Sequence, residues 1–320
     1  MIIKALSADR TISWVVASFA ILAIVGLMVP NWVLNGTMFG LARGLAVLGL
    51  LVLWRTGLVS FGHALYFGLG AYAVALLEKY TGVSDVFVRL AVALATAAAV
   101  GFMLGFVLRN HRGIFFAMLS LAFSMVLYGV LIKSEALGST DGFSVSQTTI
   151  LGWQPETKYP LFLTIILTGV VAAVGMQIYF RSALGHLTTA VRDNEIRVEY
   201  LGYSVAQAIH IKYVLSAALT GAAGGLFAMA LGQVDPDSMV NWTVSGELVF
   251  ISILSGPGSV AAPFIGAVAF EFLRTFAFEL APHAWQLIVG GTLLGIILFL
   301  PRGLWSLIER LPMRQERDRE

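Results

Sequence analysis

Residues 56–77 read TGLVSFGHALYFGLGAYAVALL, and this stretch decides what kind of fold the chain can form. It contains no Asp, Glu, Lys or Arg, and it has the length of roughly 17–25 residues that a transmembrane helix needs. Glycines alternate in it with Ser60, His63 and Tyr66. Because glycine lets helices pack closely and lets the backbone bend, we expect a Gly-interrupted helix in the membrane over residues 58–77.

The rest of the chain has the same apolar character. Of its 320 residues, 58% are hydrophobic and 12% are charged, and the mean hydropathy is +0.86. A soluble domain has about 45–50% apolar and about 25% charged residues. A water-soluble fold of this length cannot bury so much apolar surface, so lipid must surround the chain. Cysteine is absent, which excludes disulfides and thiol chemistry.

Eight apolar runs have the length of a bilayer crossing. They cover residues 12–29, 36–53, 58–77, 86–108, 114–132, 160–180, 211–231 and 286–300. A further apolar region, 247–280, is interrupted by Gly256, Pro257 and Gly258. All should be helices, because lipid offers no partner for free backbone groups. Two crossings within 247–280 give an all-α bundle of ten helices and a re-entrant hairpin gives eight; we predict ten.

Loop charges predict the orientation. The basic groups lie near residues 4–10, at 109–112, in the loop 181–212 and in the tail 302–320, and all alternate onto one side. The opposite loops, 133–159 and 232–247, are acidic or neutral. By the positive-inside rule both termini are cytoplasmic. The run 12–29 is expected to be the first span rather than a removed leader, because no small-residue cleavage site follows it.

Two segments of the sequence also resemble each other. At a constant offset of 196 positions, Gly62 aligns with Gly258 and Gly70 with Gly266. Two halves that each contain a Gly-interrupted helix are typical of transporters, in which such helices mark the substrate path. The charge count makes the two segments parallel, whereas an inverted repeat would oppose them, and the sequence leaves this conflict open.

The loop 181–212 has a pattern of its own. Apolar residues recur at helical spacing from Leu187 to Leu201, with charges of both signs on the other faces, and Gly202 fits the end of that helix. An amphipathic helix of this kind either docks in the groove of a soluble partner or lies on lipid headgroups. The mixed charges favour docking.

Polar residues within the spans are few. Ser60 and His63 are three positions apart and would share a helix face. A single histidine in a span more often forms only a hydrogen bond to a neighbouring helix. Glu271 and Arg274 are expected to neutralise one another, while Arg43, Arg89 and Glu279 are expected near the membrane interfaces. The sequence contains no phosphate-binding loop, no H-E-x-x-H motif and no G-x-S-x-G motif. We therefore expect no catalytic residue, metal or cofactor, no nucleic-acid partner, and ATP binding only in another polypeptide.

Several segments resemble one family in order along nearly the whole chain. They are TGLVSFGHALYFGLGAYAVALL (56–77), GIFFAMLSLAF (113–123), STDGF (139–143), RSALGHLTTAVRDNEIRVEYLG (181–202), SAALTGAAGGLFA (216–228) and LPRGLW (300–305). These segments resemble the branched-chain amino acid permeases of ABC importers, a family with related permeases for urea and for aromatic or other small carboxylates. The resemblance implies a type II importer-like fold in one transmembrane domain over residues 1–320.

The resemblance also implies partners and site residues. The partners would be a homologous second permease, two cytoplasmic ATP-binding subunits and a periplasmic solute-binding protein, in the bacterial inner membrane. The loop 181–212 would be the coupling segment, and the translocation pathway would include the Gly-rich helix. The implied coupling residues are Ala190, Arg192, Asn194, Glu195 and Gly202, and the expected pathway residues are Ser60, Gly62, His63, Tyr66, Gly256 and Gly258. The rival hypothesis is an ion-coupled secondary transporter, which would share broken helices but need no ATPase.

Overall fold

A computed structural model describes residues 10–300 and 303–310 of the chain. The expected basic ends, residues 4–9 and most of the tail 302–320, lie outside this part. The described residues form helices and one minimal two-stranded sheet, which confirms the all-α class. Six stretches of the described residues are long and apolar enough to cross a membrane, and this agrees with a multi-pass protein.

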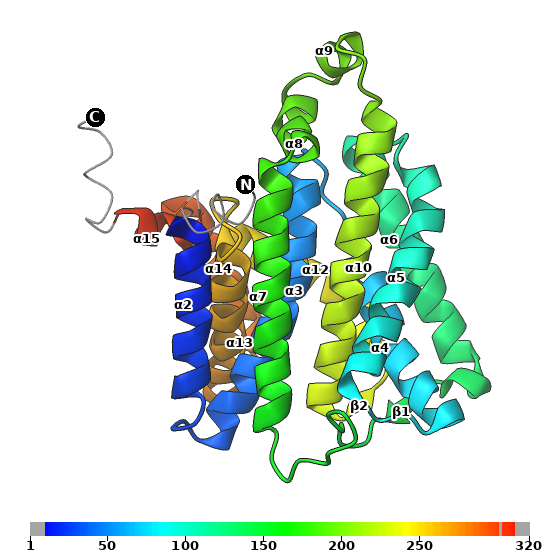
Figure 1. The fold of residues 1–320 in the computed structure, drawn as a ribbon, viewed down its shortest axis with the longest axis vertical. Helices are drawn as coiled ribbons and strands as arrows, with labels where there is room; N and C mark the ends of the chain where they lie inside the picture. Colours follow the sequence, from blue (N-terminus) through cyan, green and yellow to red (C-terminus); the bar gives the residue numbers. More distant parts are fainter. Residues whose placement is uncertain (1–9, 301–302, 311–320) are drawn as a thin grey trace.

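The long helices run along one bundle (Figure 1). They are α2 (Arg10–Val25), α3 (Asn31–Arg55), α4 (His63–Thr81), α5 (Val86–Leu108), α6 (Gly113–Lys133), α7 (Tyr159–Arg181), α10 (Val205–Leu231), α12 (Trp242–Ser255), α13 (Ala262–Leu280) and α14 (Trp285–Phe299). The shorter elements are η1 (Glu135–Leu137), β1 (Phe143–Ser144), α8 (Ala183–Asp193), α9 (Glu195–Tyr200), β2 (Gln233–Val234), α11 (Pro236–Met239) and α15 (Trp305–Arg310).

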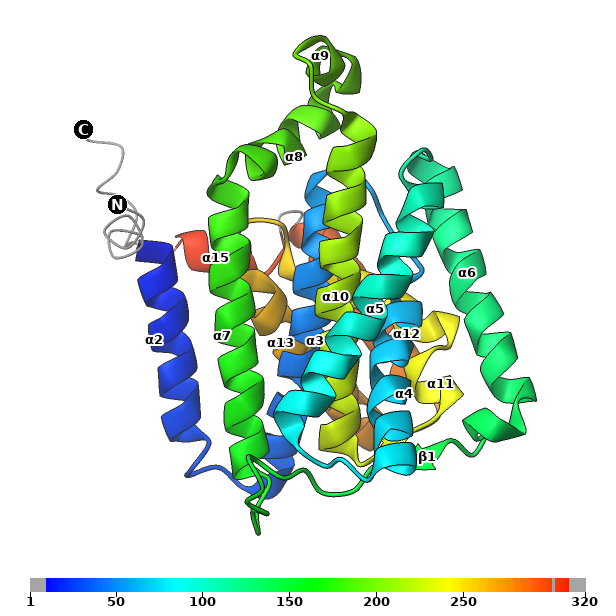
Figure 2. The same ribbon diagram turned by 45° about the vertical axis from the view of Figure 1, so that its right-hand side comes forward.

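Helices α3 and α10 form the centre of the bundle. Buried residues make up 89% of the apolar window of α3 and 72% of that of α10, against 22% for α5 and for α6. Figure 2 shows α6 at the margin, leaning away from the other helices. A helix that is apolar all round and exposed at the margin faces lipid or another membrane subunit.

Small residues bring α4 and α10 together. A side chain at Gly70 would collide with the carbonyl of Gly221, and one at Gly224 would collide with the carbonyl of Phe67. Membrane helices associate through this kind of close backbone approach, since lipid provides no hydrophobic drive between them. The Gly-rich character of residues 56–77 therefore serves helix packing as well as bending.

Two Gly-rich segments, which we call the first broken segment (residues 56–77) and the second broken segment (residues 247–280), each contain non-helical residues. The helix expected over 58–77 begins only at His63, so residues 56–62 are not helical, and Gly57 has φ +83°. The break in 247–280 is confirmed, because α12 ends at Ser255, Gly256 has φ +80° and α13 begins at Ala262. A positive φ suits glycine, which has no Cβ to clash with the backbone.

The two ends of the bundle differ. Strand β1 pairs antiparallel with β2, with Phe143 opposite Val234 and Ser144 opposite Gln233. This pairing joins the two expected outer loops, 133–159 and 232–247. Helices α8 and α9 lie at the opposite end of the bundle (Figures 1 and 2). The two kinds of loop that the charge pattern distinguished therefore lie at opposite ends.

Candidate functional site

The first broken segment is held by a chain of hydrogen bonds around His63. The His63 ring pairs through Nδ1 with Ser60 Oγ at 2.9 Å and through Nε2 with Ser216 Oγ in α10 at 2.7 Å. Ser216 Oγ donates in turn to the carbonyl of Gly49 in α3, also at 2.7 Å. Ser60 and His63 thus lie together as expected, although Ser60 precedes the helix rather than sharing a helix face with His63.

The neighbouring residues of this segment are equally enclosed. Tyr66 donates a hydrogen bond to the hydroxyl of Tyr213 at 2.8 Å, and Gly62 lies against the backbone of Ser120 in α6. The side chains of Ser60, His63 and Tyr66 are buried within the subunit. Among the polar groups expected in the pathway, His63 and Tyr66 therefore bond to α10 and Ser60 bonds to His63, since buried polar groups need partners.

The second broken segment meets the first at Arg55, the last residue of α3. The Arg55 guanidinium donates from Nε and Nη2 to the carbonyl of Pro257, at 3.1 and 2.5 Å, and it lies over the ring of Phe180 in α7 at 4.2 Å. Gly258 packs on Trp305 of α15. Arg55 thus connects the end of α3 to the break between α12 and α13.

A small cavity lies beside this junction. It has a volume of about 160 Å³ and is lined by Trp54, Arg192, Ile253, Gly256 and Pro257. The Arg192 side chain also passes next to Gly57 of the first broken segment. An expected coupling residue, Arg192, and an expected pathway residue, Gly256, therefore line the same cavity.

The segment 181–212 differs in one respect from expectation. The single helix expected through residues 187–201 is two helices, α8 and α9, which meet at Asn194. Asn194 has extended backbone angles, and its side chain accepts a hydrogen bond from the backbone N–H of Arg197 at 2.9 Å. Asparagine favours this N-cap role, because its side-chain oxygen satisfies a free N–H of the first helical turn. The break at Asn194 was missed because apolar spacing alone does not reveal a cap.

The expected stop at Gly202 is confirmed. Gly202 has φ +86°, its N–H donates to the carbonyl of Glu199, and the N–H of Tyr203 donates to the carbonyl of Val198. These two bonds form a Schellman motif, in which a left-handed glycine closes a helix.

The two remaining expected coupling residues, Glu195 and Ala190, make different contacts. Glu195 accepts a hydrogen bond from Arg112 Nε at 2.6 Å, and Ala190 packs at the edge of a buried cluster. That cluster contains Val191 and Val198 of the segment 181–212 together with Leu58, Leu65, Tyr66 and Tyr213. This segment and the first broken segment therefore share one apolar core, and a shift of either changes the packing of the other.

The tip of α9 exposes large apolar side chains. Tyr200 is 89% exposed, and Ile196, Leu201 and Tyr203 are also exposed. Charged residues of both signs surround them in the sequence. Such a compact apolar tip with a charged rim has the composition of a protein–protein contact. The sequence analysis considered the charges of this segment and missed the exposed apolar tip.

A group of four charges lies between α3, α12 and α13. Arg43 is buried, so its expected place at a membrane interface is wrong, and it forms a close ion pair with Glu271. Glu247 lies 3.5 Å from Arg43 and 3.4 Å from Arg274, and Arg274 lies 3.7 Å from Glu271. The expected pairing of Glu271 with Arg274 is thus present, but Arg43 is its closer partner. Sequence spacing missed this because Arg43 and Glu271 are 228 positions apart.

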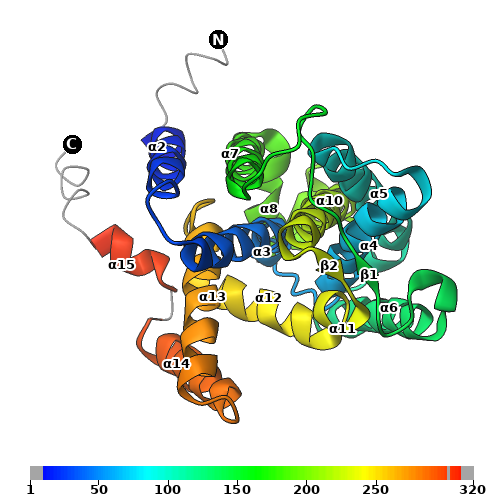
Figure 3. The same ribbon diagram turned by 90° about the horizontal axis from the view of Figure 1, so that it is seen from below.

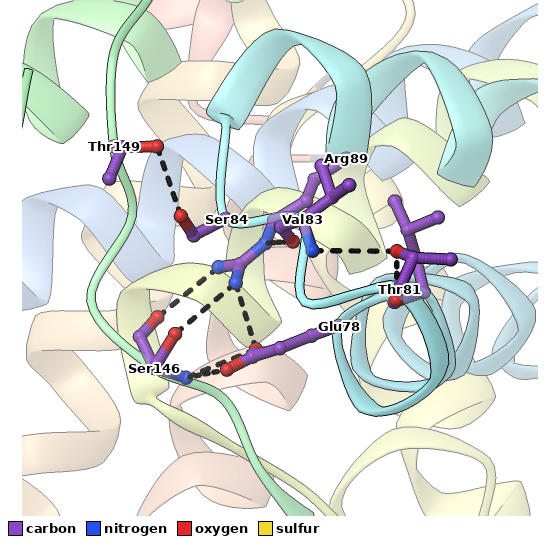
Figure 4. Close-up of polar contacts among 8 residues, drawn as sticks. Glu78, Thr81, Val83, Ser84, Arg89, Ser146 and Thr149 are labelled. Atoms are coloured by element: carbon purple, nitrogen blue, oxygen red, sulfur yellow. Dashed lines mark hydrogen bonds and ion pairs between the residues drawn. The ribbon is translucent and has the colours of Figure 1, made fainter. Parts of the chain in front are cut away.

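A second buried arginine fastens the outer loop. Arg89 Nη2 lies 2.8 Å from Glu78 Oε2, and the guanidinium also donates to the carbonyls of Val83 and Ser146 (Figure 4). Glu78 accepts from the backbone N–H of Ser146. Arg89 lies in the first turn of α5, at the outer end of the bundle, but its side chain is fully buried and bonds to protein groups. This cluster, which we call the outer clamp, holds residues 143–149 against the α4–α5 turn.

One face of α12, which we call the open face, is exposed at two large side chains, although Gly246 between them is buried. Trp242 and Phe250 on it are 57% and 47% exposed, Gly246 has no atom near the position of a Cβ, and Ile253 lines the small cavity. Glu247 lies at the edge of this face, one helical turn before Phe250, and is partly exposed. Figure 3 shows α12 between α6 on one side and α13 and α14 on the other. The open face thus runs from the outer end of α12 to the cavity that contains Arg192.

Comparison with known proteins identifies relatives over most of the chain. A family model described as branched-chain amino acid transport system / permease component matches residues 32–298. The chain is 29% identical over 286 residues to the high-affinity branched-chain amino acid transport system permease protein LivM of Escherichia coli, which covers 81% of this chain and 67% of the relative.

A second relative is archaeal. The chain is 24% identical over 267 residues to the probable branched-chain amino acid transport permease protein LivH of Methanocaldococcus jannaschii, covering 79% of this chain and 74% of the relative. No solved structure matches the chain at a comparable level of significance.

Proposed function

The chain belongs to the branched-chain amino acid transport permeases, which are membrane subunits of ABC importers, and on this premise we propose that it forms half of the translocation pathway for a branched-chain or similar hydrophobic amino acid. The relatives are permeases of this kind rather than ion-coupled carriers. The chain therefore acts as the permease subunit, and its substrate is the part that we propose.

The observation that carries the mechanism is the junction between the coupling segment and the two broken segments. Arg192 lines one cavity with Gly256, lies beside Gly57, and follows Val191, which is buried in the same cluster as Tyr66. We infer that a movement of α8 and α9 reaches both broken segments through this packing. Closely packed interfaces transmit such movements because they repack between discrete arrangements.

The topology that we propose has ten crossings in one transmembrane domain over residues 1–320. Six stretches have the length and apolarity of a span, including α11–α12 as one. Helices α2, α4, α13 and α14 add four, and 6 + 4 gives ten. In this topology both termini, α8 and α9 are cytoplasmic, while β1 and β2 face the periplasm of a bacterial inner membrane.

The proposed partners follow from these two ends. Two ATP-binding subunits contact the permease subunits from the cytoplasm. The exposed tip of α9, with Tyr200 and Ile196, docks in one of them. A solute-binding protein delivers solute at the outer loops, and a homologous second permease completes the pathway. The marginal position of α6 and the open face of α12 support a second membrane subunit on that side.

The pathway proposed for this subunit follows the open face of α12 toward Gly256 and Gly258. Ser60, Gly62, His63 and Tyr66 are buried behind it, so we propose that they hold the first broken segment in place rather than contact solute. Polar groups within a bundle commonly have this supporting role at a substrate path.

Reconstitution tests the proposed function directly. The importer, with its second permease, ATPases and binding protein, is placed in liposomes that contain ATP, and uptake of labelled leucine is measured. Uptake should stop without ATP and persist when ionophores collapse the proton and sodium gradients. Uptake that follows an ion gradient, or uphill transport by this chain alone, would contradict the proposal.

A further inference from the structure

The four-charge group between α3, α12 and α13 has two unlike halves. Arg43 and Glu271 form the close pair, and their side chains are 6% and 5% exposed. Glu247 and Arg274 are joined only by contacts of 3.4–3.7 Å, and their side chains are 21% and 32% exposed. One half is therefore a fixed internal pair, and the other is loosely held and accessible.

The accessible half has unused bonding capacity. Among the described residues, the second carboxylate oxygen, Oε1, of Glu247 accepts no hydrogen bond, and Arg274 makes one long side-chain hydrogen bond, at 3.4 Å. A carboxylate accepts several hydrogen bonds and a guanidinium donates five. Taking charges out of water is repaid only by close geometry and further hydrogen bonds. Glu247 can therefore bind one further cationic group, and Arg274 can bind one further anionic group.

The surroundings of Glu247 and Arg274 indicate which kind of molecule can bind to them. Glu247 lies at the edge of the open face of α12, about one helical turn from the exposed side chain of Phe250. That face ends at the cavity lined by Ile253 and Arg192. A ligand there meets a carboxylate and a guanidinium with the apolar surface of Phe250 beside them, which suits a molecule that has an ammonium, a carboxylate and an apolar side chain.

We propose that Glu247 and Arg274 form a transient binding site for a zwitterionic amino acid within the pathway. The ammonium of the solute binds Glu247, and its carboxylate accepts hydrogen bonds from Arg274, while Arg43 and Glu271 stay paired and hold the site in place. Charged hydrogen bonds of this kind are strong and directional. Because Glu247 and Arg274 pair with each other again after the solute leaves, the site releases solute readily. This inference rests on the proposed function.

Thiol protection tests the site without relying on transport. The chain has no cysteine, so Phe250→Cys, placed in an importer freed of other cysteines, gives one reactive position on the open face. A water-soluble methanethiosulfonate reagent should modify it, and millimolar leucine should slow the modification at least threefold. Isopentylamine, which lacks the carboxylate, should protect less. Ser252→Cys, on the buried side of α12, serves as the unreactive control.

The variants decide between a binding and a structural role. Glu247→Gln and Arg274→Gln should each abolish the protection by leucine and lower leucine uptake about tenfold, while ATP hydrolysis stimulated by the binding protein stays within about twofold. Glu279→Gln, at the exposed end of α13, should change neither. The inference is overturned if Phe250→Cys does not react, if leucine gives no protection, or if protection survives both substitutions. Loss of ATP-dependent uptake in the unaltered importer would instead refute the proposed function.

Discussion

Arg112 donates a hydrogen bond from Nε to Glu195 at 2.6 Å, and the same guanidinium donates from Nη1 to the carbonyls of Arg109 and His111. This pair ties α9 to the turn between α5 and α6. Arg112 and Glu195 are 83 positions apart in the sequence. Their hydrogen bond therefore gives α9 a contact with the bundle in addition to its chain connections to α8 and α10. In the proposed coupling mechanism, this contact transmits a movement of α9 to the membrane helices α5 and α6.

Reversing one charge of this pair should uncouple the importer. Glu195→Arg places two cations together, so α9 should lose its hold on the α5–α6 turn while the chain still inserts in the membrane. Both side chains are about one-third exposed, so the stability should change by less than about 1 kcal/mol. We expect more ATP hydrolysed per leucine imported, measured in proteoliposomes. The double variant Arg112→Glu/Glu195→Arg should recover part of the coupling, and normal uptake by Glu195→Arg would rule out this role.

The exposed tip of α9 should carry much of the ATPase contact. Tyr200→Ala removes its most exposed aromatic side chain, and truncation of a central aromatic at an interface commonly costs about 2 kcal/mol or more. The affinity of the detergent-solubilised permease pair for its ATPases should fall about 30-fold in a pull-down titration. Tyr80→Ala, an exposed tyrosine at the other end of the bundle, is the control. Equal effects of the two substitutions would show that the tip of α9 has no special part in assembly.

Loss of the His63 ring should loosen the first broken segment. His63→Ala removes the hydrogen bonds to Ser60 and Ser216, and leaving buried polar groups without partners costs about 1–3 kcal/mol. The thermal midpoint of the purified protein should fall by several degrees, and uptake should fall with it. His111→Ala, in an exposed turn, should leave the midpoint unchanged. A stable but inactive His63→Ala protein would instead point to direct contact with solute.

The outer clamp should control the order of the loop 143–158. Glu78→Gln leaves the fully buried Arg89 without its ion partner, and removing one member of a buried pair typically costs about 3–5 kcal/mol. The loop should become sensitive to protease added from the outside, because its backbone contact from Ser146 to Glu78 also weakens. Glu135→Gln, at an exposed position in η1 before this loop, provides the comparison. Unchanged cleavage in Glu78→Gln would mean that the strand pairing of Phe143 with Val234 holds the loop by itself.

The sequence by itself determined the features that depend on local pattern. Apolar length and the scarcity of charge predicted membrane helices, and Gly256 and Gly202 predicted a break and a helix end that the structure confirms. These predictions succeed because the need of backbone groups for partners in lipid, and the freedom of glycine at positive φ, act within a few residues of the chain.

Only the tertiary structure decided which distant residues meet. Arg43 with Glu271, His63 with Ser216, and Arg192 beside Gly256 are contacts between helices, and no spacing along the chain encodes them. The same holds for the non-helical residues 56–62, in which Ser60 bonds to His63 of α4 and the N–H of Phe61 donates to Ser120 of α6. Burial and partner choice depend on how helices pack, so they follow from the whole bundle rather than from any one segment.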